Sequence, residues 1–288
     1  MPQMIDKLYD AVEHKGHVCL GLDTDLSYLP PDLAESNLSL QEKLFRFNQR
    51  IIDATLDVAA VYKVQIAYYE ALGIDGLLAY AQTLQYLREK GALVIADVKR
   101  GDIAKTAEMY AKAHFEGMLE ADFITVNPFM GMDTLQPYYP YLKTGDKGIF
   151  ALVATSNPGA GDIQGIVAAD GESVSEKLGR MLEREGEQFL GECGYSAIGA
   201  VVGCTNRQQT VRIRQRLPHT FFLIPGYGAQ GGKAEDLKDY FQDGNGGVVN
   251  SSRGILLAYR KSEYAGLPFG QAARAEAIRM RDEIRNAI

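Results

Sequence analysis

The sequence contains no tryptophan, three cysteines and four histidines among its 288 residues. The cysteines are odd in number and lack the spacing of a zinc site, which argues against a disulfide framework or a structural metal. We interpret Cys19, Cys193 and Cys204 as core or near-core thiols of a protein from a reducing compartment. The chain also lacks a G-x-S-x-G motif and a histidine-rich metal set, so acyl transfer and metal-dependent hydrolysis are poorly supported.

Long apolar runs are absent as well. No stretch approaches the roughly 18 apolar residues that suggest a membrane-spanning helix. Residues 1–17 mix charges at helical spacing and have no apolar segment of the signal-peptide type. The formal net charge of −7 and the scattered basic residues argue against nucleic-acid binding. We therefore expect a cytoplasmic protein with no membrane and no nucleic-acid partner.

What the sequence does contain is a series of short, β-branched apolar runs. Amphipathic segments with helical spacing, such as 41–58 and 103–121, lie between these runs. This alternation is typical of a parallel sheet covered by helices, and eight such units in one chain favour a closed barrel over a doubly wound sheet. We predict an α/β fold, a single (β/α)8 TIM barrel, as one catalytic domain over residues 1–288. The eight runs span residues 17–22, 59–65, 92–97, 122–127, 149–154, 197–203, 221–225 and 247–250.

Polar residues follow most of these runs, at the point where each predicted strand ends. In a TIM barrel the carboxyl ends of all strands open into one shared mouth, where ligands bind. We therefore expect these side chains to line a single site. The glycine-rich segment 155–173 is too long for a plain connection and is predicted to be a lid or binding loop. The polar residues are Asp23, Lys63, Asp97, Lys99, Asn127, Ser156 and Arg253.

The most unusual stretch is DVKRGD, residues 97–102, directly behind an apolar run. Asp97 and Lys99 are two residues apart, so on a strand they project to the same side, and Lys63 lies inside another apolar run. Asp102 precedes a helical segment at a position typical of an N-cap. Burying such charges is costly unless they pair. The four residues Lys63, Asp97, Lys99 and Asp102 therefore predict a paired array that fixes an ammonium group against a reacting carbon.

A glycine-rich segment, PGYGAQGG, follows the seventh apolar run. It matches G-x-G-x-x-G, but a dinucleotide site also needs an acidic residue at the end of the next strand, where this chain has Asn250. Loops after the seventh and eighth strands of TIM barrels frequently bind phosphate. We predict a phosphate loop with Gly226, Gly228 and Gly231, and Arg253 as its cation. The alternative is a glycine-rich turn beside an exposed arginine.

With these segments in this order, the chain resembles the orotidine 5′-phosphate decarboxylase family, particularly its longer bacterial branch. The most specific stretch is DVKRGDIAKT, residues 97–106, directly after the third predicted strand. The stretches CLGLD, YKVQ, TSNPGA, IPGYGAQGG and NSSRGI occur in the order known for that family. The resemblance therefore covers residues from about 17 to 257, nearly the whole predicted barrel.

The resemblance implies a lyase that converts orotidine 5′-monophosphate to uridine 5′-monophosphate and CO2 in pyrimidine biosynthesis, without a cofactor or a metal. It also implies a homodimer whose two sites are shared between subunits. Lys99 would stabilise the anion at C6 of the substrate and then protonate that carbon. The implied catalytic residues are Lys63, Asp97, Lys99 and Asp102. Asp102 and Thr106 would reach into the partner subunit's site. The implied substrate-binding residues are Asp23 for the ribose, Ser156 for the pyrimidine, and Gln230 and Arg253 for the phosphate.

Three other functions stay open from the residues themselves. A metal-assisted decarboxylase or synthase of keto sugar phosphates would use Asp97 and a neighbouring carboxylate to bind Mg²⁺. That chemistry needs a further acidic residue near the second strand, where this chain has Lys63 and Gln65. A Schiff-base aldolase would use Lys63 or Lys99 as its nucleophile. A barrel that only senses a phosphorylated ligand is the third alternative.

Overall fold

Eight parallel strands form a closed barrel in the computed structural model, which describes residues 3–204, 207–228, 232 and 234–288. Each strand pairs with its neighbour in sequence, and β8 pairs with β1. Every predicted apolar run overlaps one of the strands, so the predicted (β/α)8 barrel is confirmed. The strands are β1 (Val18–Gly21), β2 (Val61–Gln65), β3 (Val94–Arg100), β4 (Phe123–Val126), β5 (Gly148–Ala154), β6 (Ser196–Val202), β7 (Thr220–Ile224) and β8 (Gly247–Ser251).

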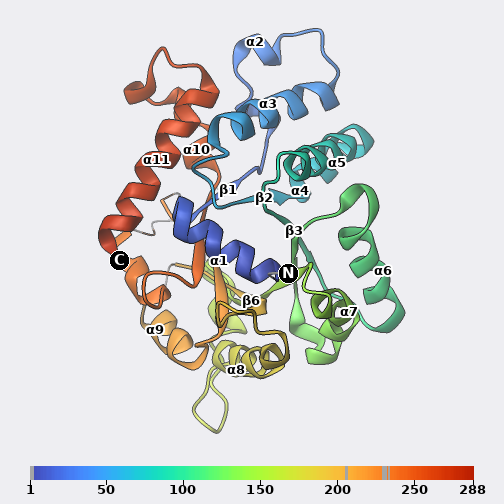
Figure 1. Ribbon diagram of the computed structural model, residues 1–288, viewed down its shortest axis with the longest axis vertical. Helices are drawn as coiled ribbons and strands as arrows, with labels where there is room; N and C mark the ends of the chain where they lie inside the picture. The colour runs from blue at the N-terminus through green and yellow to red at the C-terminus, as the bar shows by residue number, and fades with distance from the viewer. Residues whose placement is uncertain (1–2, 205–206, 229–231, 233) are drawn as a thin grey trace.

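Helices surround the barrel (Figure 1). Three of them begin with a capping box, Gln3 with Asp6, Ser39 with Glu42 and Ser173 with Glu176, which satisfies backbone N–H groups of the first turn. The α-helices are α1 (Met4–Lys15), α2 (Pro31–Ala34), α3 (Leu40–Thr55), α4 (Ala67–Glu70), α5 (Gly73–Glu89), α6 (Ala104–Phe115), α7 (Tyr139–Lys143), α8 (Val174–Gly186), α9 (Arg207–Arg216), α10 (Arg253–Leu256) and α11 (Phe269–Ala287). Short 3-10 helices are η1 (Leu26–Tyr28), η2 (Gly117–Leu119), η3 (Pro128–Met130), η4 (Met132–Tyr138), η5 (Pro158–Asp162), η6 (Glu187–Phe189), η7 (Ala234–Tyr240), η8 (Ala258–Arg260) and η9 (Ser262–Tyr264).

Alternate strand residues divide between two apolar cores. Ile95 of β3 lies in the core inside the barrel, whereas its neighbours Val94 and Ala96 lie in the core between the strands and the outer helices. This period of two is the geometry of any strand. The inner core also contains Ile5 and Leu8 of α1, so this helix closes one end of the barrel. The opposite end, at the carboxyl ends of the strands, is not covered by α1 and can hold a ligand-binding site.

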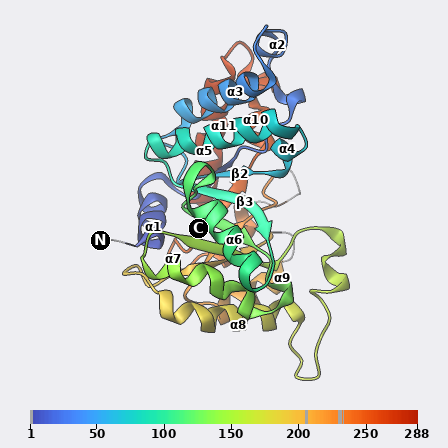
Figure 2. The same cartoon turned by 90° about the vertical axis from the view of Figure 1, so that its right-hand side faces the viewer.

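Figure 2 shows this polarity from the side, with α1 at one end of the barrel and the segment between β5 and α8 at the other. That segment, residues 155–173, contains η5 and an isolated bridge between Val167 and Ser173. Its apolar side chains Ile163, Ile166 and Val167 are more than half exposed. Its role as a lid or binding loop stays a prediction.

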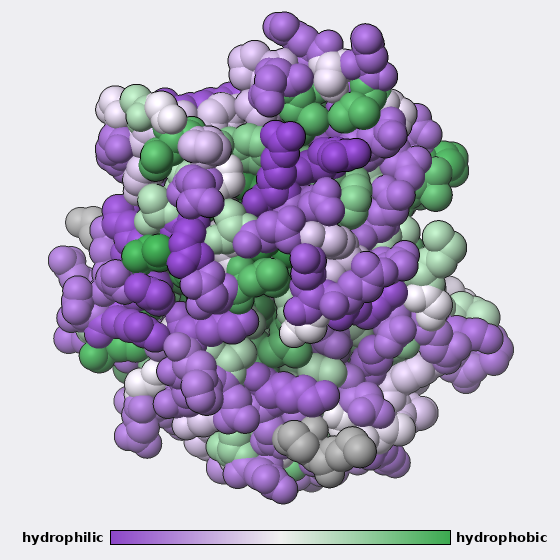
Figure 3. All heavy atoms as spheres, turned by 45° about the horizontal axis from the view of Figure 1, so that its top comes forward, coloured by the Kyte–Doolittle hydropathy of each residue, from purple (hydrophilic) through white to green (hydrophobic). Residues whose placement is uncertain are grey.

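The face in Figure 3 is mostly hydrophilic, and apolar residues appear on it as small groups between charged and polar ones. Among the described residues, no helix combines the length and the apolar character needed to cross a bilayer.

The segment 103–121, predicted as one amphipathic helix, is shorter in the structure. Helix α6 ends at Phe115, and a 3-10 turn begins at Gly117, whose φ of 68° lies in the left-handed region. Glycine adopts this conformation without the steric cost that a side chain would add, so the helix ends where the chain turns.

Candidate active site

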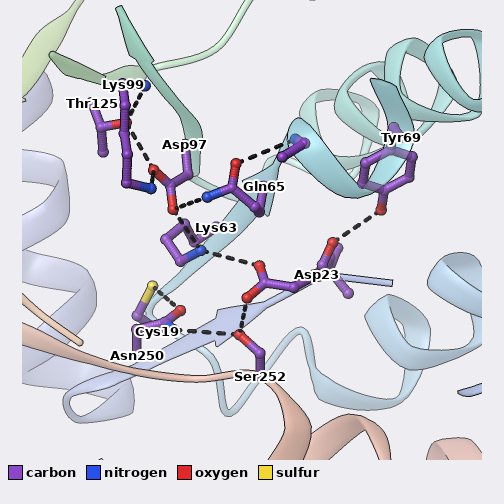
Figure 4. Close-up of polar contacts among 12 residues, drawn as sticks. Cys19, Asp23, Lys63, Gln65, Tyr69, Asp97, Lys99, Thr125, Asn250 and Ser252 are labelled. Atoms are coloured by element: carbon purple, nitrogen blue, oxygen red, sulfur yellow. Dashed lines mark hydrogen bonds and ion pairs between the residues drawn. The ribbon is translucent and has the colours of Figure 1, made fainter. Parts of the chain in front are cut away.

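Four of the predicted site residues meet at the carboxyl ends of β1, β2 and β3 (Figure 4). The ammonium group of Lys63 lies between two carboxylates, 3.1 Å from Asp23 Oδ1 and 2.9 Å from Asp97 Oδ2. Lys99 Nζ lies 2.6 Å from the other oxygen of Asp97. The result is an alternating chain of charges from Asp23 to Lys99, which we call the charged array.

The members of the charged array differ in burial. The side chains of Lys63 and Asp97 are 6% and 7% exposed, whereas that of Lys99 is 45% exposed. Burial alone would lower the pKa of Lys63, but Asp23 and Asp97 outweigh it and raise that pKa above its ordinary 10.5. Burial alone would raise the pKa of Asp97, but Lys63 and Lys99 hold it below its ordinary 3.8. Both buried groups are therefore charged at neutral pH.

Every acceptor position of the Asp97 carboxylate is used. Oδ2 accepts from Lys63 Nζ and, at 2.8 Å, from Gln65 Nε2; Oδ1 accepts from Lys99 Nζ and, at 2.9 Å, from Thr125 Oγ1. A carboxylate has about four such positions, so this one is saturated and rigid. Gln65 and Thr125 were not predicted as site residues. The sequence could have indicated them only by their position, because Gln65 and Thr125 lie near the carboxyl ends of the second and fourth strands, which open into the mouth.

Replacing Asp97 by asparagine is expected to lower the free energy of unfolding by about 3–5 kcal/mol at pH 7, because Lys63 would stay buried with one carboxylate partner removed. The folded pKa of Asp97 lies below its unfolded value, so the carboxylate stabilises the fold above pH 3.8. That contribution is lost as the pH falls through the folded pKa. The difference between variant and wild type should therefore shrink below pH 3.8 in urea unfolding curves with unchanged slope.

The control for this measurement is Asp53→Asn. Asp53 is partly exposed and lies 3.3 Å from Lys90 on the outside of the barrel, where an ion pair contributes about 1 kcal/mol or less. An Asp97→Asn protein as stable as the Asp53→Asn protein would contradict the energetic coupling of the array.

The strand that carries Asp97 and Lys99 is irregular. Ala96 pairs with Ile124 and Arg100 with Val126, so the three residues between them face only Thr125 on β4. The two side chains meet through this bulge, with Lys99 at a φ of 45°, and not through the regular alternation that the sequence suggested. Arg100, the next residue, does not join the charged array and donates to His114 Nε2 on α6 at 3.2 Å.

Two adjoining cavities open over the charged array, with volumes of about 390 and 320 Å³. Both are lined by Lys63, Asp97, Pro225 and Asn250. The larger one is polar and is also lined by Asp23, Tyr28, Gly226, Ser252 and Arg253. The smaller one is lined by Lys99 and by the apolar side chains Leu152, Val201 and Leu223, together with Ser156. This two-part pocket fits a ligand with a flat apolar ring at one end and a polar, anionic tail at the other.

The polar part holds Asp23 in place through a relay of hydrogen bonds. Ser252 Oγ donates to Asp23 Oδ2 at 2.7 Å, and Asn250 Nδ2 donates to Ser252 Oγ at 3.3 Å. One carboxylate oxygen of Asp23 therefore serves Lys63 and the other serves Ser252. Ser252 was not predicted as a site residue, although it lies in the NSSRG stretch.

Of the predicted phosphate loop, Gly226 lines the polar part of the pocket beside Arg253. Gly226 and Gly228 have φ angles of 100° and 67°, which a residue with a side chain rarely adopts. Arg253 is exposed at the start of α10 and has no hydrogen bond or ion pair within the described part of the chain, so its guanidinium is available to an anion. Two further predicted phosphate residues, Gln230 and Gly231, lie outside the described residues.

Asp102 and Thr106 do not join the array within one chain. Asp102 Oδ1 accepts from the backbone N–H of Ile103 at 2.8 Å, and Thr106 is exposed on the first turn of α6. The interpretation of Asp102 as an N-cap was wrong, because α6 begins at Ala104 and Ile103 occupies the cap position. Asn127 was expected at the mouth with the other strand-end residues, but it lines neither cavity; its Oδ1 accepts from the backbone N–H of Phe129 and caps η3.

The fold and the site together define a TIM-barrel enzyme with a saturated, charged array at the carboxyl ends of its strands. The family described as orotidine 5′-phosphate decarboxylase / HUMPS matches residues 16–266, and the chain belongs to this family. The resemblance found in the sequence is thereby confirmed.

Relatives and solved structures agree with this assignment. A relative from Clostridium kluyveri named orotidine 5′-phosphate decarboxylase is 56% identical over 98% of this chain and 97% of its own length. One from Clostridium botulinum strain Langeland with the same name is 59% identical over 96% and 98%. The crystal structure of a putative orotidine 5′-phosphate decarboxylase from Streptomyces avermitilis superposes with a TM-score of 0.83 at 33% identity, over 100% of this chain and 96% of that one.

Proposed function

We propose that this chain decarboxylates orotidine 5′-monophosphate to uridine 5′-monophosphate and CO2. The observation that carries the proposal is the half-exposed ammonium group of Lys99, held 2.6 Å from Asp97 in the apolar part of the pocket. The names of the relatives, at 56–59% identity over nearly the whole chain, support the same reaction. They also favour it over the sugar-phosphate chemistry that shares the family description.

The reaction breaks the bond between C6 of the pyrimidine and its carboxylate. The electron pair stays on C6 in an orbital in the ring plane, where the π system does not delocalise it, so stabilisation must be electrostatic. In our proposal the ammonium group of Lys99 faces this carbon, stabilises the developing charge and transfers its proton to C6 as CO2 leaves. The neutral amine regains a proton from solvent, which its 45% exposure allows.

Asp97 has a different part in the proposed reaction. Its saturated carboxylate stays ionised and faces the departing carboxylate of the substrate. Two like charges about 4 Å apart repel by roughly 4 kcal/mol at an effective dielectric constant near 20, and this repulsion disappears as CO2 forms. Asp97 also fixes the ammonium group of Lys99. Since this fixed ammonium group supplies both the stabilising charge and the proton, the proposed chemistry requires no cofactor.

The rest of the substrate matches the two-part pocket. The pyrimidine would lie against Leu152 and Val201 with Ser156 at its edge, and the ribose hydroxyls against Asp23. The phosphate would contact Arg253 and the glycine loop at Gly226. Since the phosphate is remote from the breaking bond, its binding free energy serves to position the ring over Lys99.

We further propose that the active form is a homodimer in which Asp102 and Thr106 of each chain complete the partner's site. Asp102 is followed by the exposed apolar side chains of Ile103 and of Met109 on α6, and Phe129 and Met130 of η3 are also exposed. The two segments are adjacent, because a Cβ on Gly101 would lie 2.7 Å from the carbonyl oxygen of Asn127. An apolar rim around a site suits a protein partner.

The proposed function is tested by incubating the protein with orotidine 5′-monophosphate in EDTA and following the ultraviolet absorbance of the substrate. Loss of the substrate signal with release of uridine 5′-monophosphate is expected, because the site uses fixed charges of the chain. Activity that appears only after Mg²⁺ is restored would instead favour metal-assisted sugar-phosphate chemistry. Reductive trapping of a carbonyl substrate on Lys63 or Lys99 would favour an aldolase.

A further inference from the structure

The backbone of Lys99 is held in an unusual conformation. Its φ of 45° lies in the left-handed region, which costs a non-glycine residue about 1–3 kcal/mol and persists only where the surroundings enforce it. Lys99 is the last of three β3 residues that face a single residue of β4, so the regular ladder between the two strands is interrupted here. Some other group must bind the Lys99 N–H.

Thr125 of β4 provides that group. Its Oγ1 accepts from the backbone N–H of Lys99 at 2.9 Å and donates to Asp97 Oδ1 at 2.9 Å (Figure 4). A hydroxyl has one hydrogen, and a carboxylate only accepts, so the direction of both bonds is fixed. Thr125 is 1% exposed and lines the smaller cavity, so water does not compete freely for either bond.

These bonds close a ring through both ends of Lys99. Its backbone N–H is bound to Thr125, its Nζ is bound to Asp97 Oδ1, and Thr125 is bound to the same carboxylate oxygen. One side chain therefore fixes both the backbone bulge and the anion that orients the ammonium group. A valine of the same shape would fill the space but make neither bond.

We propose that Thr125 is a positioning residue for decarboxylation, which holds Lys99 in its bulge and aims the ammonium group at the reacting carbon. The inference rests on the proposed function of Lys99. Thr125 acts through Lys99 and Asp97, so its loss affects the chemical step more than substrate binding. Because a displacement of about 1 Å at a reacting group costs on the order of 100-fold in rate, Thr125→Val should lower kcat by roughly 10- to 100-fold. The KM should change less than about threefold.

The experiment compares three variants by kcat, KM and melting temperature. Thr125→Val removes the hydroxyl, and Thr125→Ser keeps it. The matched control is Thr220→Val, because Thr220 is also 1% exposed, lies on a barrel strand and donates to a carboxylate, that of Glu183, but at the opposite end of the barrel. Both valine variants lose one buried hydrogen-bonded hydroxyl, so both should lose similar stability. Only the change at Thr125 should lower kcat.

Rescue by serine separates positioning from packing. The proposal is supported if Thr125→Val loses turnover with KM retained and Thr125→Ser keeps kcat within about threefold of wild type. It is overturned if Thr125→Val keeps wild-type kcat, or if the serine variant is as slow as the valine variant. Should Thr125→Val fail to fold, Thr125→Ala gives the same comparison without the extra methyl groups in the cavity.

A structural measurement distinguishes this inference from the proposed function. If wild-type protein does not decarboxylate orotidine 5′-monophosphate, the proposed function fails, and the crystal structures of wild type and Thr125→Val decide the role of Thr125 alone. Positioning is supported if Lys99 lies in the left-handed region in wild type and leaves that region in Thr125→Val. It is also supported if the distance from Lys99 Nζ to Asp97 Oδ1 is longer in the variant than 2.6 Å. An unchanged bulge overturns it.

Discussion

Lys99→Ala protein is expected to bind uridine 5′-monophosphate and to have almost no turnover. Removing an ammonium group that both stabilises the anion and donates the proton combines two effects, each about 10²–10⁴-fold, so kcat should fall on the order of 10⁵-fold. Binding should survive because Asp23, Arg253 and the apolar wall are untouched. The substrate's ultraviolet absorbance measures turnover, and titration calorimetry with uridine 5′-monophosphate measures binding.

Two further substitutions make this result specific. Lys105→Ala removes an exposed lysine that pairs with Glu108 on the surface of α6, and it should leave kcat unchanged. Arg253→Ala removes the predicted phosphate cation, and it should raise KM roughly 10- to 100-fold through lost charged hydrogen bonds. Arg274, which pairs with Asp57, is the control for loss of an arginine. Full turnover by purified Lys99→Ala protein would end the proposed mechanism.

The geometry also explains why Lys63 is a poor substitute for Lys99. Lys63 is 6% exposed and lies between two carboxylates, whereas Lys99 contacts one carboxylate and lines the apolar part of the pocket. The two carboxylates raise the pKa of Lys63 and hold its ammonium group between them. The array therefore separates two tasks: Lys63 fixes Asp97, and Lys99 faces the ligand.

The barrel was predictable because its signal is repeated along the chain. Parallel strands buried on both faces leave continuous apolar runs, and each run recurs before a helix. The polar residues at the ends of these runs were predictable for the same reason, since closing the barrel brings all strand ends together. Asp23, Lys63, Asp97 and Lys99 could thus be placed at one mouth from their positions alone.

The partners of these charges could not be predicted in the same way. Which hydroxyl meets Asp97 depends on the register of β4 against β3, and the bulge shifts that register at Thr125. The bulge consists of Asp97, Val98 and Lys99, so it contains neither the glycine nor the proline that would have indicated it in the sequence. Asp102 shows a related limit, because the helix begins at Ala104, one residue later than the sequence suggests, and this shift leaves Asp102 outside the cap position.

Mixing two inactive proteins is expected to restore activity if the sites are shared. Lys99→Ala and Asp102→Ala dimers should each be nearly inactive, because every site then lacks one of the two groups. In a mixed dimer, one site combines an intact Lys99 with the intact Asp102 of the other chain. After full exchange of equal amounts, half of the dimers are mixed and half of their sites are intact, which gives about one quarter of wild-type activity.

The recovery must be measured alongside the exchange itself, because unmixed dimers would also stay inactive. Native mass spectrometry of two chains with different tags gives the mixed fraction, and activity should rise in proportion to it. A control mixture of Lys99→Ala with Asp97→Asn should recover nothing, since both changes lie in the same half of the site. Inactivity of a fully exchanged Lys99→Ala and Asp102→Ala mixture would place Asp102 outside the partner's site. The carboxylates of the array would then be Asp97 and Asp23 of the same chain, the two that contact Lys63.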